Sequence, residues 1–130
     1  MGAWSHSSFG NDDASDFIDE VEADGQSALL NAFEVIERLK ADAYLEAPDA
    51  CVALAAAELV AAAGRKPPSD FPLPASALLP RLTANAALRE RATAAVRRLL
   101  DYSELKELWQ ETYDFSAWKA SVADLLERLT

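Results

Sequence analysis

Cysteine is almost absent from this chain of 130 residues, and the single Cys51 excludes an internal disulfide. Together with the only histidine, His6, it provides too few soft ligands for a structural zinc site, so we expect no metal. The four glycines form no phosphate-binding loop, and no nucleophile motif is present, so we also expect no cofactor. A lone thiol on an apolar segment favours a reducing, cytoplasmic location.

Long hydrophobic runs are also missing. The longest covers residues 50–63 and is interrupted by Glu58, so it is too short to span a bilayer. The first residues lack the basic start and apolar centre of a secretion signal. We therefore expect a soluble, cytoplasmic protein without membrane partners.

No stretch alternates apolar and polar residues long enough to predict a strand, whereas apolar residues recur at helical spacing. The sequence predicts an all-α fold, a compact orthogonal bundle of about six or seven short helices in a single helical domain, 1–130. The expected helices cover residues 12–24, 26–41, 49–63, 75–86 with Pro80 ending or kinking it, 87–101, 104–112, and a last stretch from Asp114 or Ser116 to about 129.

The segment 49–63 is rich in alanine and apolar on every side, which predicts a buried central helix. Gly64 stands in the usual position for ending such a helix. Residues 1–10 have no helical period and predict an irregular N-terminal arm, whose Trp4 and Phe9 favour docking onto the core. Four prolines predict an extended, proline-rich connector over 65–74.

Charge is distributed unevenly along the chain. The net charge is −10; residues 1–64 carry 13 acidic and two basic side chains, and residues 65–130 carry nine acidic and ten basic ones. The acidic half argues against binding of nucleic acid, which requires a basic surface. It is compatible with docking on a basic partner protein or with a role in solubility alone. The acidic residues that we expect to face such a partner are Asp12, Asp13, Asp16, Asp19 and Glu20.

Glu58 is the one charge in the apolar central segment, so we expect it to be at least partly buried. A buried carboxylate is costly unless it is paired, hydrogen-bonded or protonated. One interpretation is structural, with Glu58 bonded to the N-terminal arm or paired with an arginine such as Arg81 or Arg97. The other is functional, with Glu58 at the floor of a pocket that His6 and Trp4 of the arm close.

Cys51 has no basic neighbour in sequence that would lower its pKa, so we expect a buried, inert thiol. The basic residues Arg89, Arg91, Arg97 and Arg98 recur along one predicted helix without interleaved aromatic residues, which does not favour nucleic acid.

Four stretches of the chain share a pattern with a known family. They are Met1-Gly2-Ala3-Trp4 with Phe9 and residues 11–17, the alanine-rich 55–62, the segment 103–109, and Trp118 followed by Leu125-Leu126. Over nearly its whole length the chain resembles the bacterial family called domain of unknown function 4259. The family carries no assigned activity, so the resemblance implies a compact bacterial domain and no chemistry.

Three functions remain open from the sequence. The first is a non-enzymatic protein-binding or regulatory domain that uses its acidic N-terminal half, and we favour it because no catalytic constellation is visible. The second is an enzyme or small-molecule-binding protein with a pocket around Glu58. The third is a structural homo-oligomer that uses apolar faces of the last two helices.

Overall fold

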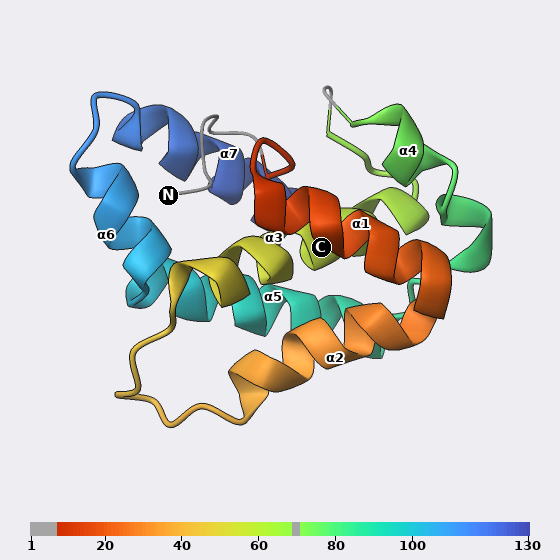
Figure 1. Cartoon of the computed structure of the whole chain (residues 1–130), viewed down its shortest axis with the longest axis horizontal. Coiled ribbons are helices and arrows are strands. Elements are labelled where there is room, and N and C mark those ends of the chain that lie inside the picture. The colour runs from red at the N-terminus through yellow and green to blue at the C-terminus, as the bar shows by residue number, and fades with distance from the viewer. Residues whose placement is uncertain (1–7, 69–70) are drawn as a thin grey trace.

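The computed structural model describes residues 8–68 and 71–130, and in these ranges the chain is helical throughout its regular structure (Figure 1). The described part contains seven α-helices and one short 3₁₀ helix, η1. The all-α prediction is therefore confirmed. The elements are α1 (Asp12–Asp24), α2 (Gln26–Glu37), α3 (Ala47–Ala63), α4 (Leu73–Ser76), η1 (Leu79–Arg81), α5 (Ala86–Asp101), α6 (Glu104–Gln110) and α7 (Phe115–Arg128).

Helix α3 lies at the centre of the bundle, as predicted (Figure 1). It contacts α1, α2, α5, α6, α7 and η1, and every residue from Ala53 to Ala62 is buried. The many alanines leave room for neighbouring helices to approach closely on several sides. Burial on every side explains why the segment lacks a polar face.

Short polar side chains start three of the helices. The Asn11 side chain accepts a hydrogen bond from the Ala14 N–H (2.7 Å) at the start of α1. Asn85 and Ser103 cap α5 and α6 in the same way. Gly25 separates α1 from α2 with φ of +66°, a left-handed conformation that favours glycine and allows the abrupt change of direction.

The predicted helix over 26–41 ends earlier, at Glu37. The chain then leaves the helical path so that Leu45 can enter the core, where it is 1% exposed. This loop is held by α6, because the Glu104 N–H donates to the Leu45 carbonyl oxygen (2.8 Å). The Glu104 side chain also accepts from the Ala47 N–H (2.7 Å), so α3 begins at Ala47 instead of 49.

The segment predicted as a helix over 75–86 does not form one helix. Helix α4 covers Leu73–Ser76, so it begins within the range 65–74 that we expected to be an extended connector. The expected interruption at Pro80 is present, because η1 covers Leu79–Arg81 and residues 82–85 are not helical. Pro74 is tolerated because it stands in the first turn of α4, where its missing N–H is not needed. Pro80 lies in the first turn of η1, and its ring and missing N–H prevent one continuous helix.

Aromatic residues fill the space between α6 and α7. The Trp109 and Trp118 rings stack with centroids 6.4 Å apart, and both side chains are buried. The two helices are slightly shorter than expected, ending at Gln110 and Arg128. Phe9 packs against the core and meets the Phe71 ring edge-on at 5.6 Å.

Candidate functional site

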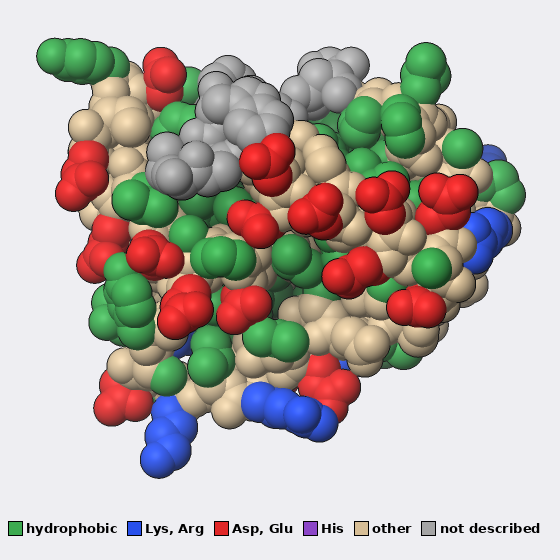
Figure 2. Space-filling model, in the orientation of Figure 1, with side chains coloured by type: hydrophobic (Ala, Val, Ile, Leu, Met, Phe, Trp, Pro, Cys, Tyr) green, Lys and Arg blue, Asp and Glu red, His purple; other side chains and the backbone are tan. Residues whose placement is uncertain are grey.

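Helix α1 presents a row of carboxylates to solvent (Figure 2). Its apolar residues Ala14, Phe17 and Val21 are buried on the core side, so the remaining positions point outward. We call the exposed carboxylates the α1 acidic surface: Asp12, Asp16, Asp19, Glu20, Glu22 and Asp24. Of the five predicted partner-facing residues, only Asp13 is half-buried, and its charge acts on Cys51 of α3.

The α1 acidic surface is not neutralised from within the described part of the chain. None of its carboxylates forms an ion pair with the described residues. The last turn of α1 holds Glu22 and Asp24 and no basic residue, although the helix dipole favours positive charge at that end. The carboxylates of α1 repel one another, and this repulsion does not stabilise the fold.

Several arginines of the second half are instead bound to the first half. The Arg91 guanidinium donates two hydrogen bonds to Glu37 (2.7 and 2.8 Å), and this contact lowers the pKa of the Glu37 carboxyl. Arg98 donates to the Ala43 carbonyl oxygen. Arg91 and Arg98, two of the four arginines that recur along this helix, therefore hold the bundle together.

Glu58 is buried at 3% exposure, and its carboxylate lies 2.8 Å from the Arg128 guanidinium of α7. The predicted burial is confirmed, and an arginine does pair with it, but that arginine is Arg128 and not Arg81 or Arg97. Arg128 also donates to Asp124 (2.7 Å) and to the Lys66 carbonyl oxygen (3.3 Å). The pair therefore joins the central helix to the end of the last one.

Sequence reasoning missed Arg128 because no local pattern links it to Glu58, 70 positions away. In the sequence, Arg128 stands out only because it lies four positions after Asp124 in the last turn of a predicted helix. That spacing is typical of an exposed i,i+4 ion pair. Arg128 reaches the buried Glu58 carboxylate only because α7 packs on α3.

The Cys51 thiol is buried at 4% exposure in α3. Burial, with a smaller contribution from the charge of Asp13, raises its pKa to about 12. The thiol is therefore protonated at neutral pH and a poor nucleophile, as predicted.

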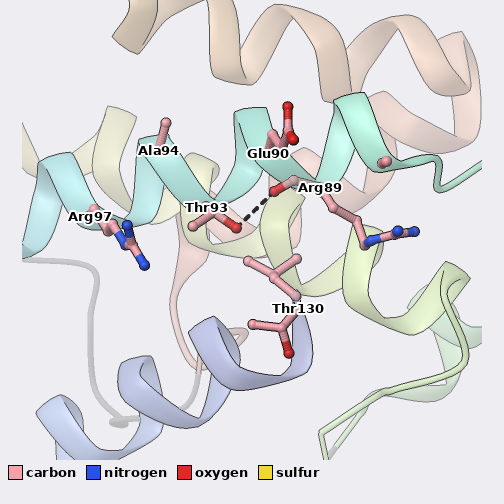
Figure 3. Close-up of a pocket in the computed structure, with 8 residues that line it drawn as sticks. Arg89, Glu90, Thr93, Ala94, Arg97 and Thr130 are labelled. Atoms are coloured by element: carbon pink, nitrogen blue, oxygen red, sulfur yellow. Dashed lines mark hydrogen bonds between the residues drawn. The ribbon is translucent and has the colours of Figure 1, made fainter.

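A shallow groove of about 530 Å³ lies between α5 and the residues that follow α7 (Figure 3). Arg89 and Arg97 of α5 border it, and the Thr93 hydroxyl between them donates to the Arg89 carbonyl oxygen (2.8 Å). Glu90 lines the same groove, so positive and negative charges are mixed. The groove therefore gives no clear preference for an anionic ligand.

A second groove, of about 280 Å³, runs between α1 and a proline segment that consists of Pro72, just before α4, and Pro74, in the first turn of α4. Its lining is mainly apolar, with one acidic and one hydroxyl side chain: Phe9, Ser15, Ile18, Asp19, Pro72 and Pro74. It adjoins the α1 acidic surface through Asp19, which belongs to both. No sequence pattern predicted this groove, because it joins residues more than 50 positions apart.

His6 and Trp4, which we expected to close a pocket over Glu58, lie outside the described residues. Within residues 8–68 and 71–130, no cluster of three histidine, cysteine or acidic side chains has the geometry to hold a metal ion. No helix in the same ranges is both long enough and apolar enough to cross a membrane.

Comparison with known proteins gives one match. The model of a family described as a domain of unknown function (DUF4259) matches residues 2–121 of the chain. No curated protein and no solved structure matches the chain.

Proposed function

The chain belongs to the family described as a domain of unknown function (DUF4259), and we propose that it is a non-enzymatic binding domain whose α1 acidic surface docks on a basic partner protein. The observation that carries the proposal is a helix with six exposed carboxylates and no ion pair to any described residue. Opposite charges on a partner would be steered to this surface and would relieve its repulsion.

The cost of this surface to the fold supports the proposal. Carboxylates four positions apart on one helix, such as Asp12, Asp16 and Glu20, repel each other by a few tenths of a kcal/mol per pair. Glu22 and Asp24 stand at the unfavourable end of the helix dipole. Solubility alone requires net charge, and that charge need not be concentrated on one helix.

Glu58 offers less support for a small-molecule site. Its carboxylate lies against Arg128, and it lines neither of the two grooves described above. A buried ion pair that joins two helices is a sufficient structural reason for a charge at this position.

The test compares two variants with equal charge changes. One carries Asp16→Asn, Asp19→Asn and Glu20→Gln on α1; the other carries Asp101→Asn, Glu111→Gln and Glu127→Gln, which are exposed elsewhere. Both variants and the wild type, tagged at the C-terminus, are used to capture proteins from lysate of the native host at low and high salt, followed by mass spectrometry.

We expect one stoichiometric basic partner for the wild type and the control variant at low salt. The α1 variant should lose it, and high salt should remove it from every bait, because screening weakens steering by surface charge. A partner that the α1 variant retains, or that binds equally at high salt, would show that the α1 acidic surface is not the docking site.

A further inference from the structure

The groove between α1 and the proline segment deepens the proposed function, on which this inference rests. We infer that this groove receives one apolar side chain of the partner, from a short peptide segment in which lysine or arginine flanks that side chain. The apolar side chain would lie on Ile18, Pro72 and Pro74. The flanking cations would contact Asp19, which lines the groove, and Glu22, three positions further along α1.

The walls of the groove are suited to an apolar group. Ile18 and Phe9 are half-buried, and the Phe9 ring is held edge-on by Phe71, 5.6 Å away. Pro72 and Pro74 have no N–H to donate, so that side of the groove presents mainly hydrocarbon. Leu73, between them, is 84% exposed and adds apolar surface beside the groove that a partner would cover.

The size of the groove favours a side chain over a small-molecule ligand. Its volume of about 280 Å³ is below the range of about 300–1,000 Å³ typical of pockets that enclose a drug-sized molecule. An open groove of this size can cover part of one large apolar side chain. Because the groove is open, the peptide that carries this side chain can continue along α1 in both directions.

Helical geometry places a defined subset of the carboxylates beside the groove. At 100° per residue, Ser15, Ile18, Asp19 and Glu22 share one side of α1, whereas Asp16 and Glu20 lie on the other side of the exposed surface. Among the described residues that line the groove, none is basic. The charge next to the apolar walls is therefore negative, which selects a basic peptide and disfavours an acidic one.

The first measurement uses two amidated peptides that differ at one residue, Lys-Lys-Leu-Lys-Lys and Lys-Lys-Ser-Lys-Lys, titrated into the full ¹⁵N-labelled chain. We expect the leucine peptide to shift the amide signals of Ser15, Ile18 and Leu73. The serine peptide should bind about tenfold more weakly, since partial burial of a leucine contributes about 1.4 kcal/mol or more.

The second measurement compares two double variants with equal charge changes. Asp19→Asn with Glu22→Gln removes the carboxylates beside the groove, and Asp16→Asn with Glu20→Gln removes two on the other side of α1. The leucine peptide should bind the first variant several-fold more weakly than the second. Neither variant alters a buried side chain, so both should fold.

Three results would overturn the inference. They are equal binding of the two peptides, equal loss of binding in the two double variants, and no binding of the leucine peptide to the wild type. Suppose that one of these three results is obtained and the triple α1 variant still loses its partner from lysate. The proposed function then stands, and only the groove is excluded as the docking point. If the triple variant retains its partner, the proposed function itself fails.

Discussion

At the scale of single residues, the contact between Glu58 and Arg128 is a buried ion pair between α3 and α7. The carboxylate is 3% exposed, so its charge requires compensation from inside the protein. Arg128 provides it from the last turn of α7 and keeps part of its own surface in water, with a side chain 14% exposed. The pair explains why a charge is tolerated in a helix that is otherwise apolar.

We predict that Glu58→Gln lowers the free energy of unfolding by about 1–3 kcal/mol, because Arg128 then lacks its buried anion. Urea denaturation measures this change. The matched control is Asp124→Asn, the exposed partner of the same arginine, which should cost less than about 1 kcal/mol. An unchanged midpoint in Glu58→Gln would show that the pair does not anchor α7 on α3.

Cys51 predicts a dependence of stability on pH. Its thiol ionises near pH 9.0 in the unfolded chain and near 12 in the folded protein, so its contribution is fully present below pH 9. As pH rises from 9 toward 12, the unfolded state releases a proton that the folded state retains. The free energy of unfolding should therefore fall, with a slope of at most about 1.4 kcal/mol per pH unit.

The measurement compares denaturant unfolding of the wild type and Cys51→Ala between pH 8 and pH 11. Tyr44 also has a pKa raised to about 12, chiefly because its hydroxyl donates to Glu107, and it affects both proteins equally. The difference between the two slopes isolates the thiol. Parallel slopes would mean that the folded protein does not hold Cys51 protonated.

At the scale of elements, the end of α3 differs from the simplest expectation. Gly64 occupies the capping position with φ of −81°, and the left-handed residue is the next one, Arg65, with φ of +70°. The Arg65 N–H donates to the Ala62 carbonyl oxygen (2.8 Å) and the Lys66 N–H to that of Ala61 (2.9 Å). This is the hydrogen-bond pattern in which glycine is usual at the position of Arg65.

We predict that the double substitution Gly64→Ala with Arg65→Gly stabilises the protein by about 1 kcal/mol. A Cβ at Gly64 would meet only ordinary contacts, the nearest at 3.4 Å, and glycine at 65 would remove the left-handed strain of arginine. Thermal unfolding measures the gain, and Arg65→Ala, which keeps the strain, should change little. A loss of stability in the double variant would contradict the backbone conformation described for this turn.

At the scale of the whole molecule, the charges of the two halves have different roles. Arg91 and Arg128 of the second half compensate Glu37 and Glu58 of the first, and these contacts join helices distant in sequence. The exposed carboxylates of α1 have no such compensation in the described part of the chain. The face drawn in Figure 2 carries the row of α1 carboxylates, which contribute to the net charge of −10.

This imbalance predicts a gain in stability when the α1 acidic surface is neutralised. The variant with Asp16→Asn, Asp19→Asn and Glu20→Gln should be about 0.5–1 kcal/mol more stable than the wild type at about 20 mM salt, because repulsion along α1 is relieved. The difference should shrink toward zero at about 1 M salt, where charges are screened within about 3 Å. A lower stability at low salt would mean that these carboxylates serve the fold and not a partner.

Much of the helical framework follows from local chemistry. Asn11 and Ser103 cap their helices because a short polar side chain accepts a hydrogen bond from a free N–H group of the first turn. The interruption at Pro80 was expected, but the bounds 75–86 were wrong, because composition alone did not indicate that the helix begins at Leu73 or that residues 82–85 are not helical. The groove beside α1 had no local signal, since Ile18 and Pro72 meet only through folding.

The helical class, the central position of the alanine-rich helix and the charge of α1 could all be predicted from the order of the residues. These depend on the periodicity of apolar residues and on the identity of neighbouring side chains, which act over a few positions. Three features depend on folding: which arginine compensates Glu58, where Leu45 ends the loop after α2, and which carboxylates border an apolar groove. Such contacts join residues tens of positions apart, and they form only when packing brings separate helices together.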